Sequence, residues 1–252
     1  MPHADYILEA RNLTRKFGEI AAVQDLSIGF PRGQLHSILG PNGAGKTTLF
    51  NLLTRDYPVT SGEIYLKGER ITRLQPHQIA QRGVGRSYQI SSVYLGLTFL
   101  ENVWLAAHGA ERRGRTGFWR PISHYREAQR KSEQLLAELG LDRYTHTPAK
   151  AVSYGDQRLL EIAVTLATGP EVLLLDEPTA GLSSRETVRV KDFIESIKSR
   201  YTIVMIEHKM NVVMEISDFI HVMNFGRLIA SGTPAEIARN ADVHQAYFGM
   251  DE

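Results

Sequence analysis

The sequence predicts an α/β protein with a parallel core sheet, an antiparallel β part and an inserted helical subdomain. Short apolar strands fill the first third of the chain, and helical periodicity covers residues 97–168. Fully apolar strands then return at residues 172–175 and 202–206. Strands that are buried on both faces of a parallel sheet show such unbroken apolar runs, so the last third is expected to complete the core sheet.

Length and composition fit one folded domain over residues 1–252. The chain has 252 residues, of which 42% are hydrophobic and 23% are charged, as is typical of a globular protein. Within this domain we expect residues 1–88 and 169–252 to form the core together with the antiparallel part. We expect residues 89–168 to form the helical insertion.

Charge and cysteine content exclude several classes of function. The formal net charge is +1, so no overall field attracts nucleic acid or a membrane, and we expect no nucleic-acid partner. The chain has no cysteine, which excludes a thiolate nucleophile and a cysteine-ligated metal centre. We also expect no signal peptide, because Asp5 and Glu9 stand beside short apolar runs at the N-terminus, and no membrane span, because no stretch of about 18 apolar residues is present. Any role at a membrane would therefore require a partner.

Three strands are expected before the first helix, over residues 6–13, 22–30 and 35–39, because turn-forming residues separate three apolar runs. A Gly-rich turn follows, and the apolar spacing over residues 47–55 predicts a helix. The same reasoning predicts, in order, a strand at 61–68, a short helix at 76–82 and a strand at 84–88.

The insertion is expected to begin with a helical stretch whose one face carries Leu100, Val103, Trp104 and Ala107. An amphipathic helix over residues 128–139 that ends at Gly140, and a helix that begins near Ser153 and runs through Thr168, are expected to follow. The α/β pattern resumes after it. The predicted elements are a strand at 172–175, a helix at 184–199, strands at 202–206, 219–224 and 227–231, and two short helices after Pro234.

A phosphate-binding loop is predicted between the third strand and the first helix. The segment reads Gly40-Pro41-Asn42-Gly43-Ala44-Gly45-Lys46-Thr47 and fits the pattern GxxxxGK[ST]. The glycines let backbone N–H groups turn toward phosphates, and the helix N-terminus adds the positive end of its dipole. We expect Lys46 to reach the terminal phosphates and Thr47 to ligate Mg²⁺.

Two carboxylates end the apolar strand that follows the insertion. Asp176 and Glu177 lie at the carboxyl edge of the expected sheet, where ligands of open α/β sheets bind. Asp176 is expected to hold Mg²⁺, directly or through water, and Glu177 to polarise a water for in-line attack on a γ-phosphate. Beside a phosphate loop, this pair predicts hydrolysis of a nucleoside triphosphate.

These motifs, with five more in the same order, resemble the ATP-binding subunit of an ATP-binding cassette (ABC) transporter over nearly the whole chain. The further motifs are the signature loop Val152-Ser153-Tyr154-Gly155-Asp156-Gln157, the Q-loop Gln89, the D-loop Ala180-Gly181-Leu182-Ser183, the switch histidine His208, and the adenine-stacking aromatic Phe17. The resemblance implies a P-loop NTPase fold and ATP hydrolysis with ATP and Mg²⁺.

The resemblance also implies a role for each site residue. The implied catalytic residues are Lys46, Gln89, Glu177 and His208. The implied nucleotide-binding residues are Phe17, Gly40, Pro41, Asn42, Gly43, Ala44, Gly45, Lys46, Thr47, Thr48, Ser153 and Gly155. The implied metal-binding residues are Thr47, Gln89 and Asp176. Ser153 and Gly155 would serve the site of a second cassette, so a head-to-tail pair with two ATP molecules between the copies is implied.

Four of these motif residues also have ordinary structural explanations. Ser153 fits a helix N-cap, and Ser183-Ser184-Arg185-Glu186 satisfies a capping box, so that Ser183 also suits a helix start. A lone histidine at a strand end, such as His208, is often part of the polar surface. Phe17, taken alone, fits a place in the core equally well.

The chain departs from the common family pattern at three positions. Tyr154 and Asp156 replace the usual Gly and Gln of the signature loop, and Ser183 replaces the usual Asp or Asn of the D-loop. The first departure resembles cassettes of branched-chain amino acid importers. The implied partners are transmembrane permease subunits, a second cassette and a solute-binding protein, at the cytoplasmic face of the inner or plasma membrane. Two alternatives stay open, a cassette that acts on nucleic acid or ribosomes and an ABC exporter ATPase.

Two further segments carry weaker expectations. Residues 112–131 hold seven basic side chains beside one acidic one, which suits either a solvated face or contact with lipid headgroups. Residues 91–100 are rich in apolar side chains without one clean helical stripe. They are expected either to form a groove that receives a helix of the membrane subunits or to pack into the core of the insertion.

Overall fold

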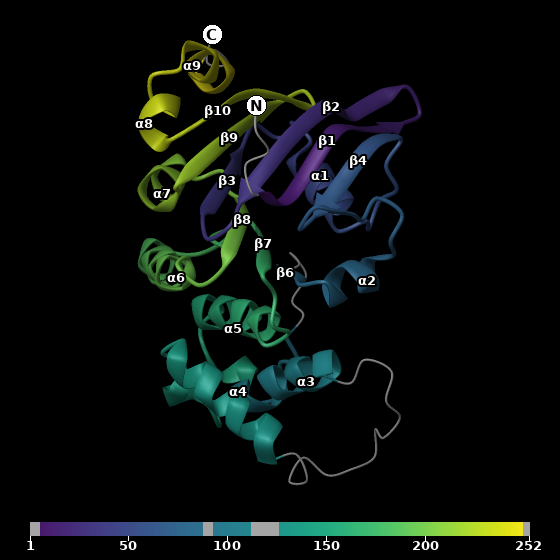
Figure 1. Cartoon of the computed structure of the whole chain (residues 1–252). Helices are drawn as coiled ribbons and strands as arrows, with labels where there is room; N and C mark the ends of the chain where they lie inside the picture. The colour runs from purple at the N-terminus through teal and green to yellow at the C-terminus, as the bar shows by residue number, and fades with distance from the viewer. Residues whose placement is uncertain (1–5, 88–92, 112–125, 249–252) are drawn as a thin grey trace.

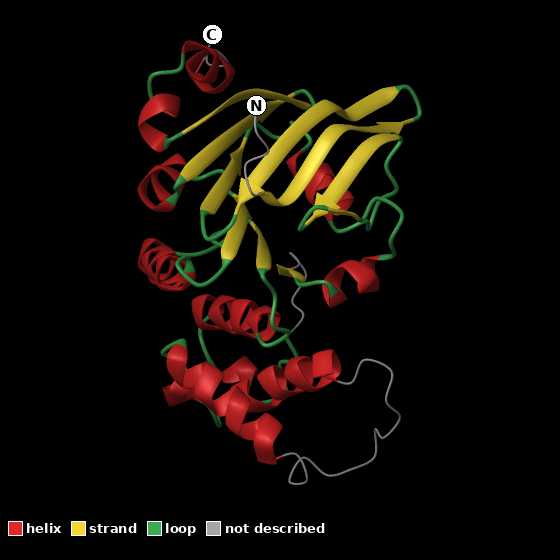
Figure 2. Cartoon of the chain, in the orientation of Figure 1, coloured by secondary structure: helices red, strands yellow, loops and turns green. Residues whose placement is uncertain are grey.

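The computed structural model describes residues 6–87, 93–111 and 126–248. Two sheets and a group of helices make up this part of the chain (Figures 1 and 2). The larger sheet has six strands in the order β10-β9-β3-β8-β7-β6, and the smaller sheet has four in the order β2-β1-β4-β5.

The larger sheet is parallel except at one edge. Strands β6 (Val84–Ser87), β7 (Val172–Asp176), β8 (Thr202–Ile206), β3 (Leu35–Leu39) and β9 (Phe219–Asn224) pair in parallel, and β10 (Arg227–Gly232) joins β9 antiparallel. Every residue of β3, β7 and β8 is buried. This is the two-sided burial that the apolar runs predict.

The smaller sheet is antiparallel throughout and lies beside helix α1 (Lys46–Leu53) in Figure 1. It comprises β1 (Tyr6–Phe17), β2 (Ile20–Pro31), β4 (Ser61–Leu66) and β5 (Glu69–Arg70). Helix α2 (Pro76–Gln81) follows it and leads into β6.

Buried side chains form two hydrophobic clusters on opposite faces of the larger sheet. On one face Ile38, Leu174 and Val204 pack with α1 and the inner side of the smaller sheet. On the other face Leu39 and Leu175 belong to a cluster that includes the helices other than α1 and α2. Alternate residues of one strand therefore serve different cores, as the two-residue period of a strand requires.

The remaining helices divide into two groups. Helices α6 (Ser184–Ile197), α7 (Met210–Ile216), α8 (Pro234–Ile237) and α9 (Ala241–Phe248) follow one another along one side of the larger sheet (Figure 1). Helices α3 (Phe99–Glu111), α4 (Arg126–Glu138) and α5 (Tyr154–Leu166) pack together beyond the β6 edge. Short 3-10 turns at Asp142–Tyr144 and Ala149–Ala151 link α4 to α5.

The expected element order holds, with differences at three places. The first strand reaches Phe17 instead of residue 13, because β1 continues through several register irregularities to pair Phe17 with Ile20. Strand β5 has only two residues, too few to leave a periodic signal. Helix α7 was not expected, because its seven residues make fewer than two turns, too short a stretch to show a clear helical period.

No helix within the described ranges is both long and apolar enough to cross a membrane.

Candidate nucleotide-binding site

The predicted phosphate loop connects β3 to α1 and is wedged between the two sheets. A Cβ atom at Gly40 would lie 2.4 Å from the Met223 carbonyl oxygen of β9, and one at Gly45 would lie 2.2 Å from the Ala22 carbonyl oxygen of β2. Gly45 also has φ +96°, in the left-handed region. Both positions therefore require glycine, and the loop backbone is fixed from both sides.

Lys46 lies over its own loop in this structure. Its ammonium donates to the carbonyl oxygens of Gly40 at 2.7 Å and Pro41 at 2.9 Å. Burial lowers the pKa of Lys46, while the nearby carboxylates of Glu177 and Asp176 act in the opposite direction. The side chain is thus a preorganised cation at the centre of the loop, with two backbone oxygens in the place of anionic ligands.

The remaining loop residues include the expected oxygen donors. Asn42 and Thr47 are exposed, and Thr48 is half-buried. Thr47 stands in the first turn of α1, so its hydroxyl is accessible at the helix N-terminus. The loop and this helix end together supply the N–H groups and positive dipole that phosphates need.

Asp176 ends β7 and pairs with Arg86 of β6. The Arg86 guanidinium donates to the Asp176 carboxylate at 3.0 Å, and both side chains are nearly fully buried. Arg86 also contacts Asn51 at 2.6 Å and Asp56 at 3.1 Å. The strand-end carboxylate is therefore present where the sequence predicts it, held by a cation that sequence reasoning did not identify as part of the site.

Glu177 follows directly and has an unusual backbone. Its φ is +47°, and its N–H donates to the carbonyl oxygen of Ile206 at 2.9 Å. A carboxylate oxygen of Glu177 lies 3.8 Å from Nδ1 of His208, too far for a hydrogen bond but close enough for the two groups to act on one bound molecule. The structure thus brings Glu177 and His208 together, and the His208 side chain is half exposed.

A buried carboxylate holds the chain segments around this pair. Glu207 is fully buried and accepts hydrogen bonds from the backbone N–H groups of Thr179 at 3.2 Å, His208 at 2.8 Å and Lys209 at 3.2 Å. Lys209 in turn donates to the carbonyl oxygen of Thr179 at 3.0 Å. Sequence reasoning missed Glu207 and Lys209. The only available signal was a carboxylate directly after an apolar strand.

Ser153 and Gly155 lie apart from the loop, at the start of α5. Ser153 is the N-cap and accepts a hydrogen bond from the Asp156 N–H at 3.2 Å. Among the described residues, no hydrogen bond or ion pair joins Ser153 or Gly155 to the phosphate loop. The N-cap explanation of Ser153 is confirmed, and it leaves the exposed hydroxyl on the surface of the molecule.

Ser183 begins α6 as the N-cap of a complete capping box with Glu186. The structural explanation of this position is therefore confirmed as well. Phe17 is 42% exposed and does not belong to the core. The Phe17 and Tyr57 rings pack edge to face with 5.5 Å between their centroids, and the Arg15 guanidinium lies 4.5 Å from the centre of the Phe17 ring.

The donor set near the loop fits Mg²⁺ rather than a protein-only metal centre. Thr47 and Asp176 offer the hard oxygen ligands that Mg²⁺ prefers when substrate phosphates complete its shell. The described part of the chain contains no cluster of three or more histidine or acidic side chains that would hold a metal by itself. Gln89, the third expected ligand, lies outside the described residues.

In the expected docking segment, residues 91–100, some side chains pack into the core of the insertion and others are exposed. Val93, Phe99 and Leu100 are buried in the helical cluster, whereas Tyr94 is 64% and Leu95 is 47% exposed. The amide of Asn102 donates to the carbonyl oxygens of Tyr94, Leu97 and Thr98 and so shapes this turn. Residues 91 and 92, and most of the basic segment 112–131, lie outside the described residues.

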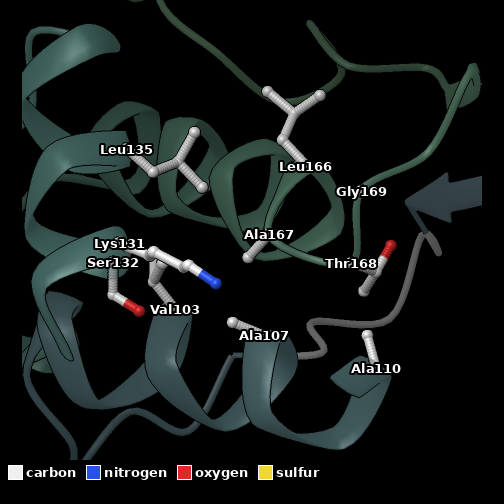
Figure 3. A pocket seen from close by; sticks show the side chains of 10 residues that line it. All are labelled: Val103, Ala107, Ala110, Lys131, Ser132, Leu135, Leu166, Ala167, Thr168 and Gly169. Atoms are coloured by element: carbon white, nitrogen blue, oxygen red, sulfur yellow. The ribbon is translucent and has the colours of Figure 1, made fainter. Parts of the chain in front are cut away.

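A separate cavity of about 360 Å³ lies among α3, α4 and the end of α5 (Figure 3). Ala107, Ala110 and Ala167 give it small apolar walls, and the Lys131 side chain extends along it. It shares no lining residue with the phosphate loop, and we assign it no part in nucleotide binding.

The chain matches two protein-family models. The model described as ABC transporter matches residues 23–180, and that described as branched-chain amino acid ATP-binding cassette transporter matches residues 227–249. The first match covers more than half of the chain and spans both the phosphate loop and the strand-end carboxylates.

Curated relatives and solved structures resemble the chain over nearly its full length. The high-affinity branched-chain amino acid transport ATP-binding protein BraF of Pseudomonas aeruginosa is 41% identical, covering 96% of this chain and 98% of the relative. The corresponding protein LivG of Escherichia coli K12 is 39% identical with the same coverage. A solved ATP-binding cassette of an ABC transporter in its ADP conformation has a TM-score of 0.86 at 28% identity, covering 97% of this chain and 99% of that one. A nucleotide-free cassette gives a TM-score of 0.84 at 27% identity, with 96% and 98% coverage.

Proposed function

The chain belongs to the ABC transporter family, and from this premise we propose that it is the ATP-hydrolysing subunit of an importer for branched-chain amino acids or related small solutes. The observation that carries the proposal is the geometry of one edge of the larger sheet. There, the phosphate loop, Asp176, Glu177 and His208 lie at the carboxyl ends of β3, β7 and β8. Similarity to BraF and LivG over the full chain supports the class of solute.

Each residue of the site has one proposed chemical role. Lys46 exchanges its two backbone carbonyl contacts for the β- and γ-phosphate oxygens of ATP. Glu177 orients and polarises the attacking water, and His208, whose Nδ1 lies 3.8 Å from the Glu177 carboxylate, contacts the γ-phosphate. Phe17 stacks on adenine, and the amides of residues 40–48 surround the phosphates.

Mg²⁺ is the proposed metal, held by Thr47, Asp176 and Gln89, and when bound it would neutralise phosphate charge. Asp176 must release at least part of its contact with Arg86 for this purpose. Because Arg86 also pairs with Asp56, its charge stays compensated when that contact is loosened.

We propose a head-to-tail pair of cassettes as the hydrolysing unit. Ser153 and Gly155 are remote from the loop of their own chain. Ser153 is exposed at the N-terminus of α5, a position that suits an anion. In such a pair, these two residues complete the site of the partner. Residues 1–88 and 169–252 then act as the catalytic part, and residues 89–168 as the part that carries the signature loop.

The proposed location is the cytoplasmic face of the inner or plasma membrane. The described chain has no helix that could span a membrane, so attachment would depend on transmembrane permease subunits. A solute-binding protein would complete the importer. The relatives that match over the full chain are named for high-affinity branched-chain amino acid transport, which favours an amino-acid importer over an exporter or a cassette that acts on nucleic acid.

The test of the ATP sandwich is the variant Glu177→Gln. The amide keeps the shape of the side chain but does not activate water, so we expect turnover to fall by about 10²-fold or more while ATP binding is retained. ATP should then trap a dimer that sedimentation or size exclusion detects. A Glu177→Gln protein that stays monomeric at high concentrations of protein and ATP would refute the sandwich.

A further inference from the structure

The N-terminus of α5 already binds a carboxylate of its own chain, that of Glu186. The Gly155 N–H donates to one carboxylate oxygen of Glu186 at 3.1 Å. The fit is close, because a Cβ atom at Gly155 would lie 2.8 Å from Cγ of Glu186. Glu186 thus occupies the position over the first turn of α5 where the dipole favours a negative charge.

The other oxygen of the same carboxylate belongs to the start of α6. It accepts from the Ser183 N–H at 3.1 Å and from the Ser183 hydroxyl at 2.6 Å. The pKa of Glu186 is lowered by the hydrogen bonds from Ser183, by that from the Gly155 N–H and by the Ser153 hydroxyl. The Glu186 side chain therefore connects Gly155, at the start of α5, to the D-loop residue Ser183.

We propose that Glu186 is a positioning residue that holds the Gly155 N–H in place of phosphate, and that the γ-phosphate of the partner's ATP must displace it. This inference rests on the proposed ATP sandwich. The Gly155 N–H has one proton to donate, so it does not serve the Glu186 carboxylate and a phosphate fully at once. The two anions would also repel each other across a few ångströms.

Displacement of Glu186 from Gly155 would change the contacts between α5 and α6. A second contact joins the same two helix starts, because Arg189 of α6 pairs with Asp156 of α5, and Asp156 also accepts from the Ser153 hydroxyl at 2.8 Å. When Glu186 leaves Gly155, it remains bonded to Ser183 and α6 keeps its cap. Arrival of ATP at the partner's signature loop is thereby converted into a changed contact at the D-loop of the same chain.

The chain provides a matched control for the test. Helix α8 begins with an equivalent capping box, in which Glu236 accepts from the Thr233 N–H at 2.7 Å and hydroxyl at 2.9 Å. Glutamine is as suitable as glutamate at this position of a capping box. Glu186→Gln and Glu236→Gln therefore make the same chemical change, but only the first alters the charge beside Gly155.

The experiment measures ATP-dependent dimerisation by sedimentation in three proteins: Glu177→Gln, Glu177→Gln/Glu186→Gln and Glu177→Gln/Glu236→Gln. Removal of the competing charge at both sites of the dimer should lower its dissociation constant by about tenfold. The Glu236 control should match Glu177→Gln alone. An unchanged or higher dissociation constant for the Glu186 variant would overturn the proposal.

A second measurement separates this proposal from the sandwich itself. If Glu177→Gln does not dimerise, the sandwich is refuted, and the contact is then judged by the amide resonance of Gly155 in the monomer. A hydrogen bond to a carboxylate should move this proton downfield, so Glu186→Gln should shift it upfield while Glu236→Gln leaves it unchanged. No difference between the two variants would refute the contact and the inference with it.

Discussion

At the residue scale, three groups of the proposed site already have partners within the protein. Lys46 is bonded to carbonyl oxygens, Asp176 to Arg86, and the Gly155 amide to Glu186. Each of these contacts occupies a group that ATP or Mg²⁺ would use. Binding therefore exchanges contacts instead of filling an unsatisfied site, which keeps buried charge compensated in both states.

Replacement of Lys46 tests this exchange. Lys46→Ala should weaken ATP binding by tenfold or more, because charged hydrogen bonds to phosphate are lost. Calorimetric titration with ATP measures the effect. Lys191→Ala is the control, since Lys191 lies on α6 and pairs with Glu215 instead of the loop. Equal affinities for the two variants would contradict the role of Lys46.

Replacement of Arg86 tests the buried ion pair. Arg86→Ala would leave the carboxylates of Asp176 and Asp56 without their shared cation, at a cost of about 3–5 kcal/mol in the free energy of unfolding. The exposed pair of Arg32 with Glu171 offers a control, for which Arg32→Ala should cost under about 1 kcal/mol. Denaturant titration distinguishes the two. Similar losses would show that burial does not govern the Arg86 contact.

Local motifs made part of the site predictable from sequence, and long-range contacts hid the rest. Lys46 and Asp176 stand in short patterns whose spacing alone indicates phosphate chemistry. Arg86 and Glu207 act through partners that are 90 and 28 residues away in the chain, at Asp176 and Thr179. The local sequence indicates no role for Arg86, and for Glu207 it shows only a carboxylate after an apolar strand, because both roles depend on contacts that form when the strands align.

At the scale of elements, strand β3 carries a buried histidine pair with β9. His36 and His221 stack at 5.4 Å between ring centres, and Nδ1 of His36 lies 3.3 Å from Nε2 of His221. Burial lowers the pKa of His36 to about 4 and that of His221 to about 3. Both imidazoles are therefore neutral in the folded protein at neutral pH.

This pair predicts a loss of stability in acid. Above the unfolded pKa of about 6.5 both states are neutral, and the histidines do not contribute to pH dependence. As the pH falls from 6.5 toward 4, only the unfolded state gains protons, so stability decreases by up to about 1.4 kcal/mol per pH unit for each histidine. Denaturant titrations between pH 7 and pH 4.5 measure the slope.

Substitution of both histidines tests whether the His36–His221 pair causes the slope of stability against pH. His36→Asn/His221→Asn should flatten it, whereas replacement of the exposed His77 by Asn should leave it nearly unchanged. A slope that is the same in the double variant and in the wild type would show that other groups cause the acid sensitivity.

Elements with strong periodicity were predicted well, and elements defined by tertiary pairing were not. The apolar strands β7 and β8 lie where their unbroken hydrophobic runs place them. The end of β1 at Phe17 depends on pairing with Ile20 across a turn, which overrides the turn-forming residues before it. Such boundaries follow from a partner strand and not from the residues themselves.

At the scale of the whole molecule, the turn before α3 exposes two large apolar side chains, Tyr94 and Leu95, which follow the proposed Q-loop residue Gln89 closely in the sequence. Tyr94→Glu should leave folding and ATP hydrolysis of the isolated chain intact, because the side chain is mostly exposed, but should abolish binding to permease subunits. Co-purification with those subunits measures this effect. Leu105→Glu, at an exposed position within α3, is the control. Unchanged assembly of Tyr94→Glu would place the docking surface elsewhere.

The position of the phosphate loop between two sheets has a thermodynamic consequence. The Gly226 N–H donates to Ala44 of the loop at 3.0 Å, and the Gly226 carbonyl accepts from Gln24 of β2 at 2.8 Å, so loop, β2 and the β9–β10 turn are joined in one place. A nucleotide bound there binds only the folded arrangement of both sheets. At 100 times its dissociation constant it would add about 2.7 kcal/mol to the free energy of unfolding. The ligand is in this sense a structural component, and a chain depleted of nucleotide should be the form most readily cleaved by proteases.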